Sequence, residues 1–256
     1  MTGAQVKDWL ELLEYGCTQA STTCLDVIID QAGRDEPILP GVLSVEPPLP
    51  WQSLFDGLPE EGAVEVAPLM VRVDFSQPLQ RQWLVGLTHE LQGQDQLLVL
   101  ASLWPFQALA EHLGQCLEAR HGRRTGLLRF YDPRVFPLLF SRVLTADQQA
   151  PLLLPAVFWS WQDRDGKAQC LPGVAGLPLD DVRSLPLLLS DDQIQALSCC
   201  SEATLAIATA EEALFGGCSP EQRFQACYGV LLEACQAGLL LATERTAYLL
   251  DRAGSA

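Results

Sequence analysis

The sequence predicts an α/β fold of the α+β type, with a mixed sheet flanked by helices in an N-terminal lobe and a smaller all-α C-terminal lobe. Two observations predict it. Short runs rich in apolar and β-branched residues alternate with segments of helical periodicity up to about residue 165. Beyond that point glycine and proline become frequent, and then only helical patterns follow. We therefore expect two domains, at residues 1–165 and 166–256.

Five apolar runs predict the strands of the sheet. They lie at residues 24–29, 68–73, 97–102, 126–131 and 157–161. The third run has no polar interruption before its last residue, so we expect it to be a central strand. Two segments with many prolines or glycines, at residues 37–50 and 166–186, are predicted to be a loop and a connector, because proline neither donates to a ladder nor continues a helix.

Helical periodicity at residues 6–15, 79–91 and 106–117 predicts the helices that flank this sheet. Pro105 stands at the start of the third, where its missing N–H costs nothing. In the second domain, Ser190 is expected to cap a helix at residues 191–199. The sequence Ser219-Pro-Glu-Gln222 has the pattern of a capping box, and Thr243 is expected to cap the last helix.

Composition restricts the classes of partner. The chain has 32 acidic and 16 basic residues, a formal net charge of −16, so it repels phosphate backbones and we expect no nucleic-acid partner. No apolar stretch approaches the roughly 20 residues that a bilayer requires, and the first residues lack a secretory pattern. We expect no membrane partner and a cytoplasmic location. The nine cysteines include no C-x-x-C pair, and we expect no metal and no cofactor.

The most distinctive local feature is Arg129-Phe-Tyr-Asp-Pro-Arg134, a predicted strand that ends in an aspartate-proline turn. Asp132 is expected to accept hydrogen bonds from the backbone amides after it, or to form an ion pair with Arg129 or Arg134. Pro133 would then start the next helix. Two interpretations stay open, namely a structural corner locked by an ion pair and an exposed recognition surface that includes Tyr131.

Arginines gather around this corner. The island comprises Arg120, Arg123, Arg124, Arg129, Arg134 and Arg142, and Asp132 is the only acidic residue between positions 120 and 142. In so acidic a chain, the island predicts either a docking surface for acidic side chains of a partner or the neutralisation of carboxylates elsewhere in the same fold.

Catalytic patterns are sparse, and we expect no enzyme and no catalytic residue. Ser102, at the end of a predicted strand, has no G-x-S-x-G sequence around it, and no phosphate-binding glycine motif or H-E-x-x-H occurs. His112 is best interpreted as a hydrogen-bonded structural histidine. A small cytosolic hydrolase that uses Ser102 or a cysteine with His112 is the alternative, and a structural subunit of an assembly is another.

An ordered set of segments resembles the adaptor or chaperone family of type VI secretion effectors, which carries a Tap/TEC-like domain formerly of unknown function. The strongest segment is Arg129-Phe-Tyr-Asp-Pro-Arg-Val135, preceded by Leu97-Leu-Val-Leu-Ala-Ser102 and by a helix with His112-Leu113. Upstream, the matching segments are Leu25-Asp-Val-Ile-Ile-Asp30, Ser53-Leu-Phe-Asp-Gly57 and Ala67-Pro-Leu-Met-Val71. The resemblance covers about residues 24–145.

The resemblance implies a protein that binds its cognate toxic effector before secretion, stabilises it and helps to load it onto the valine-glycine repeat spike protein. The effector, and with it the spike protein, are therefore the expected partners, and neither catalysis nor a cofactor is implied. Our candidates for partner contact are Arg129, Tyr131, Asp132, Arg134, His112, Arg120, Arg124 and Asp56.

Overall fold

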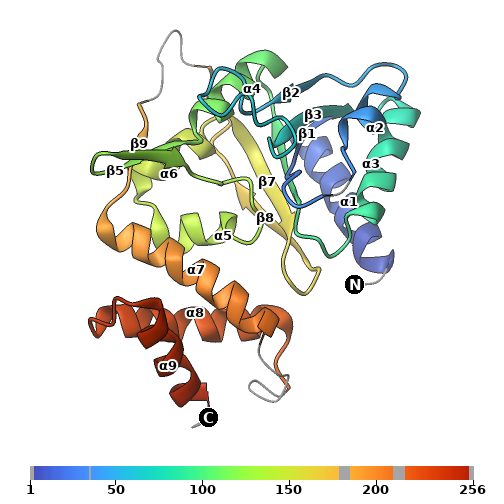
Figure 1. Ribbon diagram of the computed structural model, residues 1–256. Helices are drawn as coiled ribbons and strands as arrows, with labels where there is room; N and C mark the ends of the chain where they lie inside the picture. The colour runs from blue at the N-terminus through green and yellow to red at the C-terminus, as the bar shows by residue number, and fades with distance from the viewer. Residues whose placement is uncertain (1–2, 35, 179–184, 210–216, 254–256) are drawn as a thin grey trace. The chain divides into compact units, whose positions relative to one another are not determined.

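The computed structural model describes residues 3–34, 36–178, 185–209 and 217–253, and the chain divides into two compact units (Figure 1). The first comprises Met1–Phe140 and Leu144–Leu188, and the second comprises Ser141–Val143 and Leu189–Ala256. The first unit combines sheets with helices and the second is helical, so the predicted fold class is confirmed. No helix within the described ranges is both long and apolar enough to cross a bilayer.

The first unit is built on a six-stranded sheet in the order β2-β3-β1-β4-β7-β8. The strands are β1 (Cys24–Ile29), β2 (Trp51–Ser53), β3 (Leu69–Asp74), β4 (Leu97–Ser102), β7 (Ala156–Gln162) and β8 (Ala168–Pro172). All five neighbouring pairs are antiparallel. β4, the strand predicted to be central, lies between β1 and β7 and is buried at all six positions. Its continuous apolar sequence follows from cover on both faces.

One face of the sheet packs against α1 (Gly3–Gln19), α2 (Leu39–Leu43) and α3 (Pro78–Glu90). Figure 1 shows α1 and α3 together on this side. Because side chains alternate along a strand, Val27, Val71 and Val99 lie on the same face and join a core with Trp9, Leu13 and Leu84 from the helices, among others. Close approach requires glycine at position 16, where a Cβ atom would lie 2.7 Å from the Phe158 ring.

The opposite face holds a buried ion pair. Asp26 of β1 lies directly opposite Arg72 of β3, and its carboxylate accepts two bonds of 2.7 Å from the Nε and Nη2 of that arginine. Asp26 has no solvent exposure. Arg72 also donates to the carbonyl of Trp104 at 3.0 Å and lies over the Phe106 ring, 5.5 Å from its centroid. Complete burial raises the pKa of Asp26 to about 6, and the guanidinium of Arg72 opposes that rise.

Two predicted connections prove to be structured. The segment at residues 37–50 contains the short helix α2, whose proline lies at its start, where no amide is needed. The segment at residues 166–186 contains β8, which pairs with β7 through a tight turn at Gly166, whose φ is 75°. The first unit therefore extends to Leu188, past the predicted boundary at residue 165. Residues 179–184 of this segment lie outside the described ranges.

The predicted strand at residues 126–131 is wrong in its position. The chain instead forms a hairpin of β5 (Glu118–His121) and β6 (Arg124–Leu127), with Gly122 in the turn at a φ of 59°. Residues 129–131 leave the ladder because Phe130 and Tyr131 are drawn into the core. β9 (Leu187–Leu188) pairs with β5 in parallel, so the mixed pairing that the sequence predicted occurs in this small sheet.

The second unit contains α7 (Asp191–Thr209), α8 (Pro220–Gln236) and α9 (Ala242–Ala253). Both predicted serine caps are confirmed. Ser190 exchanges bonds with Gln193, and Ser219 exchanges bonds with Gln222 in a capping box. The prediction for Thr243 is wrong, because the helix begins one residue earlier and the carboxylate of Glu244 accepts from the Leu241 amide. The predicted helix at residues 191–199 also continues further along α7.

An ion pair between Arg245 and Glu202 joins α9 to α7 within this unit. The Nε of Arg245 donates to Glu202 at 2.9 Å and its Nη2 donates to the other carboxylate oxygen. Arg245 also donates to the Leu240 carbonyl at 2.7 Å, next to the start of α9. The arginine side chain is 5% exposed, so the pair is held out of water. The bond from Arg245 lowers the pKa of Glu202, although burial acts in the opposite direction.

We expect Asp26→Asn to lower the free energy of unfolding of the first unit by about 3–5 kcal/mol, because it leaves the charge of Arg72 buried and unpaired. All six tryptophans lie in the first unit, so tryptophan fluorescence during urea unfolding follows this unit alone. The double variant Asp26→Leu with Arg72→Met should recover to within about 1 kcal/mol.

The matched control is Glu14→Gln, which removes the pair with Arg81. Those side chains are 38% and 48% exposed, so the cost should stay below about 1 kcal/mol. Equal unfolding midpoints for the Asp26 and Glu14 variants would contradict a structural role for the buried pair.

For the second unit, we expect Glu202→Gln to lower the free energy of unfolding above pH 4.5. The variant should also lose less of this free energy than the natural chain when the pH is lowered. A carboxyl whose pKa falls below its ordinary value of 4.5 on folding stabilises the folded state above that pH. The contribution disappears as the pH falls through the folded pKa. Far-ultraviolet circular dichroism at a series of pH values measures the effect. The control is Glu233→Gln, an exposed position on α8, which should leave the acid dependence unchanged.

Candidate functional site

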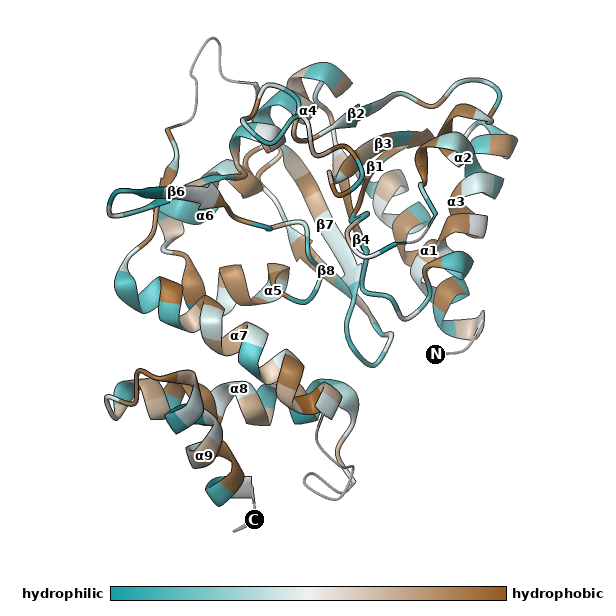
Figure 2. Ribbon diagram, in the orientation of Figure 1, coloured by the Kyte–Doolittle hydropathy of each residue, from teal (hydrophilic) through white to brown (hydrophobic). Residues whose placement is uncertain are grey.

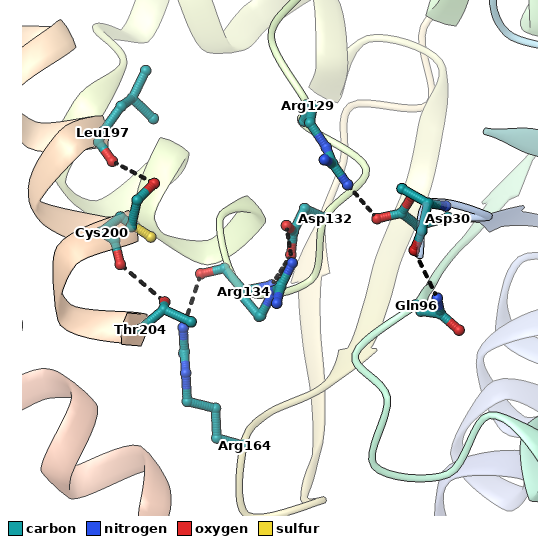
Figure 3. A network of polar contacts seen from close by, with 11 residues as sticks. Asp30, Gln96, Arg129, Asp132, Arg134, Arg164, Leu197, Cys200 and Thr204 are labelled. Carbon is teal, nitrogen blue, oxygen red and sulfur yellow. Dashed lines mark hydrogen bonds and ion pairs between the residues drawn. The ribbon is translucent and has the colours of Figure 1, made fainter. Parts of the chain in front are cut away.

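The corner at residues 128–136 is built around the carboxylate of Asp132. Its Oδ1 accepts from the backbone amide of Arg134 at 2.9 Å and from the Nε of the same residue at 2.9 Å, while Oδ2 accepts from the Nη2 at 2.8 Å (Figure 3). The backbone carbonyl of Asp132 accepts from the amides of Val135 and Phe136. Asp132 is 5% exposed, and its bonds raise the pKa of Arg134. The turn and the ion pair therefore form one unit.

The second arginine of the corner binds a different carboxylate. Arg129 donates to Oδ2 of Asp30, the residue that follows β1, and Oδ1 of Asp30 accepts from the Ala32 amide at 3.0 Å. Asp30 is 3% exposed. The Arg129 guanidinium lies 5.5 Å from the centroid of the Tyr131 ring, a cation–π contact. Burial raises the pKa of Tyr131 to about 12 despite this cation, so the phenol stays neutral.

Aromatic rings anchor the corner to the sheet. Phe136 lies 5.1 Å from Trp159 and 5.3 Å from Trp161, both in β7, and Phe130 lies 6.3 Å from Trp159, measured between ring centroids. Phe136 opens α5 (Phe136–Leu138), which passes into a π-helix at Leu139–Val143. The helix predicted to begin at Pro133 therefore starts three residues later. Close packing of this kind holds the corner in one position, as it holds an element of the core.

The structure supports the ion-pair interpretation of this corner and decides between the two arginines expected as partners of Asp132. Asp132 takes both of the bond types expected for it, and its partner is Arg134 and not Arg129. Arg129 and Arg134 are each joined to a buried carboxylate, although their side chains are 45% and 37% exposed. Most of their charge is thus neutralised inside the fold. A direct role of these residues or of Tyr131 in partner binding stays a prediction.

His112 and Ser102 have separate main-chain partners. Nε2 of His112, on α4 (Phe106–Gln115), lies 2.7 Å from the carbonyl of Pro151 in α6 (Ala146–Leu153), so this nitrogen carries the hydrogen. Burial lowers the pKa of His112 and so favours the neutral ring, although the bond to the Pro151 carbonyl acts in the opposite direction. The Ser102 hydroxyl donates to the Pro155 carbonyl at 2.7 Å. No hydrogen bond joins the two side chains in the described part of the chain.

The other candidates take no part in the hydrogen bonds of the corner that are described above. Arg120 and Arg124 are exposed on the β5–β6 hairpin, while Asp56 is exposed in the turn after β2. Partial burial and the neighbouring Glu61 raise the pKa of Asp56. Among the described residues, no group of three or more histidine, cysteine, aspartate and glutamate side chains is placed to hold a metal ion.

Sequence reasoning missed the carboxylates that the arginines bind. Asp26 and Asp30 lie four positions apart in an apolar segment, and Arg72 interrupts the apolar run of β3. A charged residue inside a buried strand signals an ion pair, so this pairing was detectable from the sequence. Arg164, which donates to the Arg134 carbonyl at 3.4 Å, carried no such signal (Figure 3).

We expect Asp132→Ala to lower the free energy of unfolding of the first unit by about 2–4 kcal/mol, since it removes three hydrogen bonds and unpairs Arg134. Arg124→Ala is the matched control, and it should change stability by less than about 0.5 kcal/mol because its side chain is exposed. Urea unfolding followed by fluorescence measures both. If both variants unfold at the same urea concentration as the natural chain, the corner is not a structural element.

Comparison with known families gives a match to part of the chain. Residues 27–151 match the model of the family described as "Domain of unknown function (DUF4123)", a little under half of the chain. The matched segment begins within β1 and ends within α6, so it contains the corner and the hairpin. No curated protein and no solved structure matches the chain.

Proposed function

We propose that this protein is a type VI secretion adaptor and chaperone. It binds a cognate toxic effector in the cytoplasm, stabilises it and helps to load it onto the valine-glycine repeat spike protein. The resemblance at residues 24–145 and the family match at residues 27–151 fall on the same part of the chain, which supports this assignment. The protein acts by binding and needs no catalytic residue or cofactor.

The observation that carries the proposal is the ion pair between Asp30 and Arg129. Asp30 ends the first segment of the resemblance and Arg129 begins the last, 99 positions further along the chain. Residues that are joined in this way belong to one folded element. The first and the last segments of the ordered set therefore meet in the first unit, which supports their interpretation as parts of one folded feature.

The test is co-expression with the protein encoded beside this one, followed by affinity purification and size-exclusion chromatography. We expect a stable complex, and a neighbouring protein that is insoluble or degraded when it is produced alone. Addition of the spike protein should give a larger complex only when the effector is present, if the adaptor delivers effector to spike.

An effector-sized protein from an unrelated locus is the control, and it should not be retained. The proposal fails if the neighbouring protein is soluble alone and elutes separately from this chain. His112→Ala separates the binding role from an enzymatic one. A hydrolase would lose turnover and keep its partner, whereas an adaptor has no turnover to lose.

A further inference from the structure

The β5–β6 hairpin has an open edge. In its small sheet the strand order is β6-β5-β9, so among the described residues β6 pairs with a strand on one side only, with β5. Arg124, Thr125 and Gly126 of β6 are exposed and Leu127 is half-buried. In Figure 2 the turn of the hairpin and the start of β6 are coloured teal, as hydrophilic residues. An exposed strand edge offers backbone groups to another chain.

The hydrogen-bond pattern between β5 and β6 determines which backbone groups of β6 point to its open edge. The amide of Leu128 donates to the Leu117 carbonyl at 2.7 Å, so residues 117 and 128 form a hydrogen-bonded pair. Pairs of this kind alternate with pairs that are not bonded to one another. The register places Arg120 opposite Thr125 and Glu118 opposite Leu127. The N–H and C=O groups of Thr125 and Leu127 therefore point away from β5, toward the open edge.

Unneutralised positive charge surrounds this edge. Arg120, Arg123 and Arg124 are exposed, and none of them has an ion pair or a side-chain hydrogen bond within the described part of the chain. Their placement differs, because Arg120 and Arg124 lie on opposite faces of the hairpin and Arg123 lies in its turn. This contrasts with Arg129 and Arg134, whose charges are bound to buried carboxylates.

We propose that β6 binds an extended, acidic segment of the effector as an added strand, with Arg120, Arg123 and Arg124 pairing with its carboxylates. This inference rests on the proposed function and names the surface and the kind of segment that it takes. Main-chain bonds to Thr125 and Leu127 supply the pairing, and the arginines select for acidic side chains.

The charges favour this occupant over two others. A second copy that paired β6 with β6 would bring two groups of three arginines together, and like charges in contact oppose that dimer. Nucleic acid would meet the same arginines but also the field of a chain with a net charge of −16. An acidic peptide segment is small enough to contact the hairpin alone.

The experiment uses the full chain and, as the probe, the protein encoded beside it. The triple variant Arg120→Glu, Arg123→Glu and Arg124→Glu should weaken the complex by at least about tenfold and abolish most of its salt dependence. The matched control is Lys7→Glu, Lys167→Glu and Arg252→Glu, which makes the same change in net charge at exposed positions elsewhere. Its affinity should stay within about twofold of the natural chain.

A second variant tests the backbone pairing without a change of charge. Thr125→Pro removes an amide that points to the open edge, a position where a strand tolerates proline. It should weaken binding while the unfolding transition of the first unit is kept. Hydrogen exchange should show that the amides of Thr125 and Leu127 become protected in the complex.

The outcomes separate this inference from the proposed function. If the natural chain binds its neighbour and both hairpin variants bind equally well, the edge is not the docking surface and the adaptor function stands. Equal loss in the control triple variant overturns the inference in favour of a general charge effect. A dimer of the natural chain that the triple variant dissociates assigns the edge to a second copy and overturns it too. If the natural chain does not bind its neighbour, both the function and this inference fail.

Discussion

The ion pair of Asp26 and Arg72 is the constraint on which the first unit depends. The two side chains lie directly opposite each other on neighbouring strands, on the face of the sheet that carries the corner. A shift of one residue in either strand would turn one charge into the apolar core under α1 and α3. Burial of both groups makes that shift costly, because an unpaired charge in the core loses its hydration without compensation. The pair thus fixes the register of β1 against β3.

The same strand also positions the candidate site. Asp30 follows Asp26 by four residues, and side chains at that spacing in an extended segment point to the same face. The carboxylate of Asp26 therefore joins β1 to Arg72 of β3, and the carboxylate of Asp30 binds Arg129 of the corner. The aromatic contacts between Phe136 and β7 complete the attachment. The corner is consequently an extension of the core, and its arginines are used largely within the fold.

Five of the six arginines of the island divide into two kinds that the sequence alone does not distinguish. Arg129 and Arg134 each meet a buried carboxylate, whereas Arg120, Arg123 and Arg124 extend from a hairpin and meet none in the described part of the chain. The neutralising interpretation of the island therefore applies to Arg129 and Arg134, and the docking interpretation stays a prediction for the three arginines of the hairpin. The charges of these three arginines lie at or next to the unpaired edge of β6 in the described part of the chain, where no carboxylate of this fold neutralises them.

The sequence by itself determined the alternation of strands and helices, the buried β4, the serine caps of α7 and α8, and the link between Asp132 and its following amide. These features depend on local periodicity and short-range hydrogen bonds, which neighbouring residues specify. Tertiary structure decided the rest. Residues 129–131 left the predicted strand because the core takes up Phe130 and Tyr131, and β8 formed because β7 offered it an edge. The choice of Asp30 as the partner of Arg129 joins positions 99 apart, and only the packed sheet brings them together.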